Sequence, residues 1–154
     1  MAASILPRAI VIGSDHGGFA LKEEIRAHLA AKFATIAVED VGCYSTDRAE
    51  YPAYGKLVAS KVTKDTDAAM PDTIGIVVCG SGIGISIAAN KVEGARCALC
   101  HDHYTGKMSR MHNNANVLAL GGRTTGPDVA KEIVDAFLTT AFEGGRHGDR
   151  IKLL

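Results

Sequence analysis

From Ala9 onward, short runs of β-branched and other apolar residues alternate with longer segments of helical period, and this alternation constrains the fold more than any other feature. It is typical of repeated strand-helix units. The predicted strands are mostly continuous apolar runs, as expected of strands covered on both faces: Ala9–Gly13, Thr35–Val41, Thr73–Cys79, Arg96–Leu99 and Asn116–Leu120. We therefore expect an α/β fold with one doubly wound, Rossmann-like, five-stranded parallel sheet flanked by helices.

The segments between these strands carry apolar stripes at helical spacing, which predict helices packed on the sheet rather than cofactor contacts. The stripes are Leu21, Ile25 and Leu29; Tyr54, Leu57, Val58 and Val62; Tyr104, Met108 and Met111; and Val129, Ile133, Phe137 and Ala141. Ligands of such sheets gather at the carboxyl ends of the strands. The candidate site loops are Ser14–Gly18, Cys43–Pro52, Cys79–Gly84, and His112–Asn114 together with Gly121–Thr125.

Length and charge narrow the class of function. The 154 residues suit one domain, 1–154, and 17 basic residues balance 17 acidic ones, so the basic excess that nucleic-acid binding needs is missing. No apolar run is long enough for a membrane span, and the start lacks a secretory signal, which predicts a cytoplasmic protein without a membrane partner. In that reducing compartment the cysteines are expected as free thiols: Cys43, Cys79, Cys97 and Cys100.

The third predicted strand ends at Cys79 and is followed by a glycine-rich turn, Gly80–Gly84, and then by a helical stretch through Asn90. Glycines let main-chain N–H groups point into one concavity, and a helix N-terminus adds partial positive charge. The turn is therefore suited to a phosphate or an oxyanion. The same field favours a thiolate at Cys79, which would make this residue usable as a base.

Nucleotide binding is the alternative interpretation of this turn. The third glycine of a dinucleotide motif would fall at Ile85, although Asp102 lies at a tolerable distance downstream. The turn also lacks the lysine of a phosphate-binding P-loop. A non-catalytic nucleotide-binding module stays open as the weaker hypothesis.

Two pairs of polar residues accompany the turn. Asp15 and His16 follow the first strand, where Asp15 alone would be read as a helix cap. His112 and Asn113 end a helix just before the fifth strand, where a histidine could simply complement the helix dipole. We nevertheless expect both pairs to face the crevice that Cys79 lines.

The segment from Cys97 to His103 has the composition of a metal site. Cys97 and Cys100, however, are three apart on a strand and would face opposite sides of the sheet. No second ligand pair lies at zinc-finger spacing, so we expect no metal. A metal-dependent hydrolase built on His101, Asp102 and His103 remains a rival hypothesis.

Three arginines are candidates for binding a phosphate. Arg146 and Arg150 lie at helical i, i+4 spacing near the end of the chain, and Arg123 follows the fifth strand. Such a pair is usually a solvated face. A phosphate clamp is the functional interpretation, because guanidinium binds phosphate through two parallel hydrogen bonds.

Five segments, in order along nearly the whole chain, resemble the B-type ribose-5-phosphate isomerases and the related galactose-6-phosphate isomerase subunits. They are Gly13–Phe19, Cys79–Gly84, Ala88–Lys91, Ser109–Asn113 and Gly144–His147. Each is weak alone, but together they are specific. The resemblance implies interconversion of ribose 5-phosphate and ribulose 5-phosphate through an enediolate, without metal or organic cofactor. An isomerase for a hexose 6-phosphate, such as allose or galactose 6-phosphate, is the alternative within the family.

The resemblance also implies roles for particular residues. Cys79 matches the proton-abstracting base, Ser81 the hydroxyl that assists proton movement, and His112 the imidazole that opens the furanose ring. The turn that holds the enediolate charge is matched by Gly80, Gly82, Ile83 and Gly84. Asp15 and Asn113 match groups that orient the substrate hydroxyls, and Tyr51 belongs to a Tyr-Pro pair that the family also has. The residues that match the family's phosphate-binding set are His16, Arg123, Arg146 and Arg150.

In that family the arginines matched by Arg146 and Arg150 are typically lent by a second subunit, which implies a homodimer, or a tetramer, with a shared active site. Two features depart from the family pattern. Glu50 stands where an aspartate usually precedes the Tyr-Pro pair. The connection Lys64–Pro71 is longer and more polar than usual, which predicts a surface loop.

Overall fold

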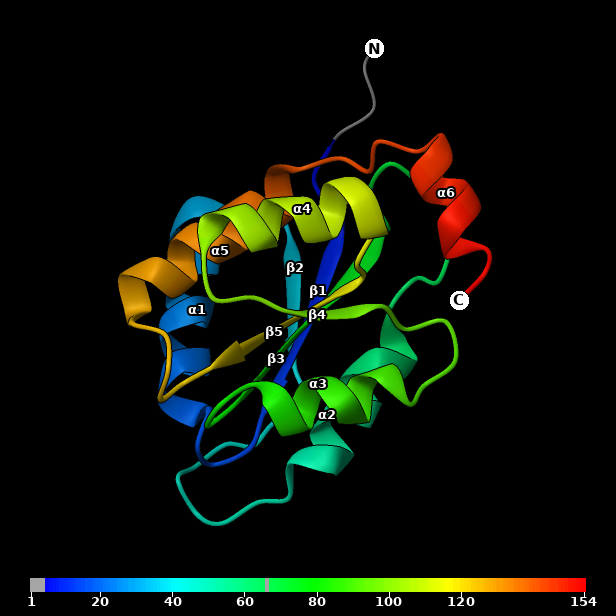
Figure 1. Ribbon diagram of the computed structural model, residues 1–154. Helices are drawn as coiled ribbons and strands as arrows, with labels where there is room; N and C mark the ends of the chain where they lie inside the picture. The colour runs from blue at the N-terminus through cyan, green and yellow to red at the C-terminus, as the bar shows by residue number, and fades with distance from the viewer. Residues whose placement is uncertain (1–4, 66) are drawn as a thin grey trace.

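The structure, a computed structural model, describes residues 5–65 and 67–154. Its five strands form one parallel sheet in the order β2-β1-β3-β5-β4, with helices on both faces (Figure 1), which confirms the predicted fold class. The strands are β1 (Ala9–Ser14), β2 (Ala37–Asp40), β3 (Thr73–Cys79), β4 (Cys97–Leu99) and β5 (Val117–Gly121). The helices are α1 (Phe19–Lys32), α2 (Tyr51–Lys61), α3 (Ile83–Asn90), α4 (His103–Asn113), α5 (Pro127–Thr139) and α6 (Arg146–Ile151).

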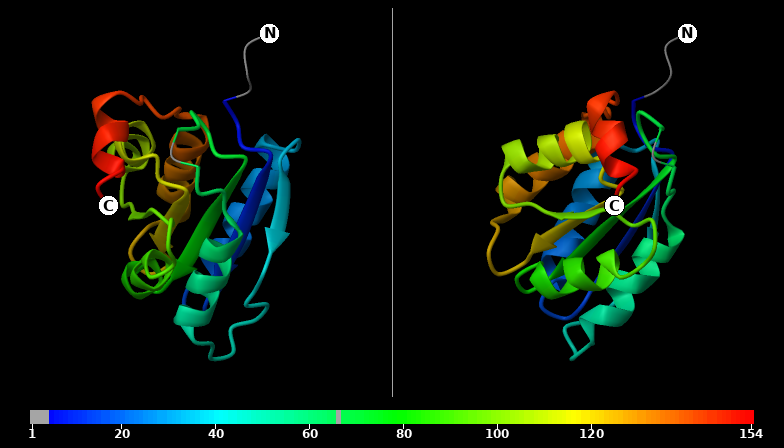
Figure 2. Two further views of the ribbon diagram at one scale, coloured as in Figure 1. Left: turned by 90° about the vertical axis from the view of Figure 1, so that its right-hand side faces the viewer. Right: turned by 45° about the vertical axis from the view of Figure 1, so that its right-hand side comes forward.

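The sheet separates two apolar cores, because successive side chains of a strand point to opposite faces. One core joins Ile10, Ile12, Ile76 and Leu118 of the sheet to residues of α1 and α5. The other joins Val11, Val77, Val117 and Ala119 to residues of α2 and α3. The right-hand view of Figure 2 shows the sheet between these two layers of helices. In the described part of the chain, every helix is too short or too polar to cross a bilayer.

Some predicted details are wrong. The strand predicted at Thr35–Val41 is shortened to β2, an edge strand whose residues are mostly exposed. The stripe at Tyr104, Met108 and Met111 is not the buried face of α4, which instead buries Gly106, Ser109 and Arg110. Other stripe members also fall outside the core: Leu57 and Val129 are exposed, and Ala141 lies beyond the end of α5.

The buried face of α4 can include the polar Arg110 because oxygen acceptors bind its guanidinium. Its guanidinium donates to Asn114 Oδ1 at 2.7 Å, to the carbonyl of Ala115 at 2.6 Å and to the carbonyl of Ala69 at 3.0 Å. Burial lowers the pKa of Arg110 to about 10. The contact with Ala69 also fastens the expected surface loop Lys64–Pro71, of which residue 66 lies outside the described residues.

Strand direction decides which loops meet. All five strands run the same way, and Cys79 at the end of β3 pairs with Gly121 at the end of β5. The loops after β1, β3 and β5 therefore share the carboxyl edge of the sheet. Each helix runs back toward the amino edge, so the last residues of α4 lie there, just before β5 begins and beside α6 (Figure 1).

Candidate active site

The sulfur of Cys79 lies at the border between the α2-α3 core and the glycine turn. Only 4% of the residue is exposed, and Sγ accepts a hydrogen bond from the main-chain N–H of Gly82 at 3.1 Å. Gly82 has a φ of 76°, and a Cβ there would lie 2.5 Å from Leu99 Cδ1, so the turn requires glycine. Because an N–H donated to sulfur stabilises a thiolate more than a thiol, this position suits a base.

Helix α3 begins at Ile83, so its N-terminus opens directly beside the sulfur. The N–H of Ile83 donates to Ser81 Oγ at 3.2 Å, which orients the hydroxyl into the turn. A Cβ on Gly84 would lie 2.7 Å from Tyr51 Cζ, so the Tyr51 ring packs on this glycine. Ser81, Tyr51 and the turn therefore lie together in the structure.

The loop after β5 closes the other side of the turn. The N–H of Gly122 donates to the carbonyl of Cys79 at 2.8 Å, and the N–H of Arg123 donates to the carbonyl of Gly80 at 2.9 Å. A Cβ on Gly80 would meet Arg123 Nη1 at 3.2 Å, so the exposed guanidinium lies against the turn. This placement suits binding of an anion at the mouth of the site.

The loop after β1 adds Asp15 and His16. Asp15 is buried and Oδ1 accepts from the N–H of Gly18 at 3.1 Å, so it closes the turn that precedes α1. His16 Nδ1 accepts from the N–H of Ala49 at 3.1 Å. The same Nδ1 also lies 3.2 Å from the carbonyl oxygen of Ala49, so either tautomer of the ring is held to Ala49 through this nitrogen.

A buried lysine that sequence reasoning missed fixes the neighbouring loop. Lys22 of α1 is fully buried, and Nζ donates to both carboxylate oxygens of Asp40, at 2.7 and 2.8 Å, and to the carbonyl of Cys43 at 2.7 Å. These bonds anchor the start of the segment that leads to Ala49 and its contact with His16. Hydrophobic periodicity gave no signal for this role, because a lysine counts as a surface residue.

Four predicted site residues lie elsewhere. His112 and Asn113 end α4, and Arg146 and Arg150 belong to α6. The expectation that His112 and Asn113 face the crevice beside Cys79 of the same chain is wrong, because α4 runs antiparallel to the strands and ends at the amino edge. Four residue steps of β5 separate the two edges, which is about 13 Å at the rise of a strand.

The residues of the rival metal-dependent hydrolase, His101, Asp102 and His103, do not form a group of metal-binding donor atoms among the described residues. Asp102 Oδ1 accepts from the N–H of Thr105 at 2.7 Å and caps α4, while His101 and His103 are exposed. Burial raises the pKa of the Cys97 thiol, which keeps it protonated. Among the described residues, the donor atoms that do lie together belong to a group that sequence reasoning missed, His112, Glu143 and His147.

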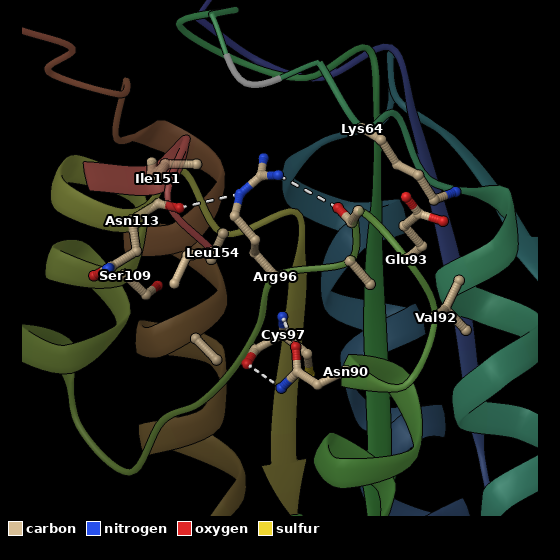
Figure 3. A pocket seen from close by; sticks show the side chains of 14 residues that line it. Lys64, Asn90, Val92, Glu93, Arg96, Cys97, Ser109, Asn113, Ile151 and Leu154 are labelled. Carbon is tan, nitrogen blue, oxygen red and sulfur yellow. Dashed lines mark hydrogen bonds between the residues drawn. The ribbon is translucent and has the colours of Figure 1, made fainter. Parts of the chain in front are cut away.

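A hollow of about 670 Å³ runs along the β4 edge, between the loop after α3 and the ends of α4 and α6 (Figure 3). Arg96 crosses it, and its Nη2 donates to the carbonyl of Asn114 at 2.9 Å. Asn113, Ile151 and Leu154 line the far wall. The hollow thus lies beside the ends of α4 and α6, which carry His112, Asn113, Arg146 and Arg150, and not beside the glycine turn.

The chain matches the Ribose/Galactose Isomerase family over residues 10–154. It is 45% identical to ribose-5-phosphate isomerase B of Escherichia coli over 148 residues, covering 96% of this chain and 94% of that protein. The structure of ribose-5-phosphate isomerase B from Clostridium thermocellum is similar with a TM-score of 0.85 and 48% identity, over 94% of this chain and 93% of that one. The Mycoplasma genitalium enzyme with bound ribulose-5-phosphate also matches, with a TM-score of 0.85 and 42% identity over 94% and 92% of the two chains.

Proposed function

Because this chain belongs to the ribose/galactose isomerase family, we propose that it interconverts ribose 5-phosphate and ribulose 5-phosphate, with Cys79 as the base. The observation that carries the proposal is the hydrogen bond from the Gly82 N–H to Cys79 Sγ. Removing a proton beside a carbonyl requires a base over the carbon and donors aimed at the oxygen that becomes anionic. The turn offers both within one short segment.

In the proposed reaction the Cys79 thiolate takes the proton from C2 of the open-chain aldose. The electron pair forms a C1–C2 double bond and the charge passes to O1, where main-chain N–H groups of the turn hold it. The proton on O2 moves to O1 with the help of the Ser81 hydroxyl. The Cys79 thiol then returns its proton to C1, which gives the ketose and restores the thiolate. Since a thiolate is a weak base, positioning and the amide donors supply most of the acceleration.

The remaining site residues are assigned to binding and to ring opening. His112 opens the furanose ring, and Asp15 and Asn113 orient sugar hydroxyls, with Tyr51 beside them. The phosphate is bound by His16, Arg123, Arg146 and Arg150. No metal or organic cofactor takes part in the proposed reaction.

The active unit is proposed to be a homodimer with shared active sites. The support is a separation within one chain. Cys79 and the glycine turn lie at the carboxyl edge of the sheet, whereas His112 and the α6 arginines lie toward the amino edge and do not reach that turn. Ile83 and Ile87, one helical turn apart on α3, are 54% and 55% exposed immediately beside that turn. An apolar face at the rim of a polar site is suited to cover by another subunit.

The pentose is preferred over a hexose 6-phosphate because the relatives from Escherichia coli and Clostridium thermocellum described above are ribose-5-phosphate isomerases. Measured kcat/KM for ribose 5-phosphate, allose 6-phosphate and galactose 6-phosphate decides between them. A higher value for either hexose would replace the substrate while keeping the reaction. A cytoplasmic location and a place in the pentose phosphate pathway complete the proposal.

The decisive test is Cys79→Ala. The variant should lose isomerisation, and also the exchange of the C1 protons of ribulose 5-phosphate with deuterium from solvent, while it still binds the sugar phosphate by calorimetry. Cys97→Ala is the matched control, because Cys97 is another strand cysteine that lies outside the turn. Activity of Cys79→Ala within about tenfold of the parent would reject Cys79 as the base.

A further inference from the structure

Three side chains meet where the end of α4 lies beside α6. The rings of His112 and His147 are stacked, with centroids 4.2 Å apart and planes 12° from parallel. The Nε2 atoms of both rings lie 3.8 Å from the same carboxylate oxygen, Glu143 Oε2. Two imidazoles and a carboxylate thus bring their donor atoms within 4.8 Å of one another.

One of these donor atoms, His147 Nε2, is buried without a hydrogen-bond partner among the described residues. The side chain of His147 is only 8% exposed, and its Nε2 makes no hydrogen bond within the described structure. Buried polar atoms in native proteins are nearly always paired with protein, water or an ion.

We propose that His112, Glu143 and His147 bind a divalent transition-metal ion such as Zn²⁺, and that the ion inhibits the isomerase by occupying His112. Ligands about 2.1 Å from a tetrahedral zinc ion are separated by roughly 3.4 Å, so the two distances of 3.8 Å to Glu143 Oε2 must shorten slightly. The His112 ring must also turn out of its stacked orientation, because the in-plane lone pairs of nearly parallel rings do not converge on one ion. His112 and Glu143 are 39% and 52% exposed and can turn toward the buried ring. Water fills the fourth position.

The ligand atoms, rather than the surrounding charges, decide which kind of ion the site takes. Arg146 and Arg150 lie on the same short helix as His147 and repel any cation. A hard ion such as Mg²⁺ depends on oxygen ligands and would gain little from two imidazoles, whereas Zn²⁺ binds imidazole nitrogen directly. The site should therefore take Zn²⁺ and reject Mg²⁺.

Binding is tested on the full chain after dialysis against a chelator, by calorimetric titration with ZnCl₂ and, separately, MgCl₂. The expected result is about one Zn²⁺ per chain, no Mg²⁺, and a loss of affinity in Glu143→Gln and in His147→Ala that exceeds the roughly 10-fold to 100-fold cost of removing an outer-shell partner. The exposed Glu143 gives a variant that should fold even where His147→Ala does not. The matched control is His101→Ala/His103→Ala, which should bind as the parent does.

Cobalt distinguishes these ligands from cysteine. With Co²⁺ the site should give visible bands of nitrogen and oxygen coordination without a sulfur-to-metal charge-transfer band. A charge-transfer band, or unchanged Zn²⁺ affinity in both Glu143→Gln and His147→Ala, would overturn the site.

The inhibitory part rests on the proposed role of His112. Zn²⁺ should lower the rate with ribose 5-phosphate at concentrations that match calorimetric binding, and Glu143→Gln should need a correspondingly higher concentration. Binding without inhibition would overturn this part. If the metal-free chain turned over no sugar phosphate, the proposed function would fail, while the calorimetric result would still decide the metal site.

Discussion

If each active site combines the glycine turn of one chain with α6 of another, two inactive variants should restore activity when they share a dimer. Cys79→Ala removes the proposed base, and Arg146→Ala/Arg150→Ala removes two exposed guanidinium groups from α6. A hydrogen bond to a charged group contributes about 1.5–3 kcal/mol, so the double variant should lose roughly 100-fold or more in kcat/KM. Each variant alone should therefore be nearly inactive at low substrate.

The expected recovery follows from the geometry. In a mixed dimer one site combines the intact turn of one chain with the intact arginines of the other, and the second site carries both defects. Random association makes half of the dimers mixed, so co-refolded variants should regain about one quarter of the wild-type activity. A site contained in one chain would regain nothing, because every chain in the mixture carries a defect.

The assay is the initial rate with ribose 5-phosphate well below KM, measured on the separate and the co-refolded proteins. A chain carrying all three substitutions, co-refolded with Cys79→Ala, is the control in which no intact site can form. Recovery no greater than this control would refute the shared site, and with it the reasoning from the 13 Å span of β5.

His112→Ala should slow isomerisation of ribose 5-phosphate but largely retain deuterium exchange at C1 of ribulose 5-phosphate, which is open-chain and needs only the base; an equal loss in both NMR assays would assign His112 another role. Lys22→Met should lower the free energy of unfolding in urea by about 1.5–3 kcal/mol, because Asp40 loses its buried charged partner but keeps Arg26 at 3.4 Å and the Gly42 N–H. Lys61→Met, which removes only an exposed ion pair with Glu39, should cost at most about 1 kcal/mol, and similar losses in the two variants would contradict the buried-pair argument.

The central strands were predictable because burial on both faces leaves a continuous apolar run that few other structures explain. The edge strand β2 was harder, since Ala37–Asp40 is mostly exposed and its pattern is that of a loop. The buried face of α4 was not predictable from periodicity. It depends on Arg110, whose partners Ala69 and Ala115 come together only in the folded chain.

The glycine turn could be located from the sequence because strand, glycines and helix follow one another without a gap. Its hydrogen bond from Gly82 to Cys79 is equally local. Placing His112 required the direction of its helix as well as the spacing of its residues. A helix that follows one parallel strand must run back before the next strand begins, and this rule places His112 at the amino edge. The partnership of His112 with Glu143 and His147 is set by how α6 docks, which spacing alone does not specify.

The donor to the Cys79 sulfur is a peptide N–H, which every residue except proline carries. Substitutions in the rest of the turn can therefore change its rim and its choice of sugar without deleting that donor. A side chain at position 82 would disturb it directly, because a Cβ there would lie 2.5 Å from Leu99 Cδ1 on a backbone with a φ of 76°. The choice of sugar can therefore change through side chains around the turn, while the main-chain hydrogen bond to the Cys79 sulfur is retained.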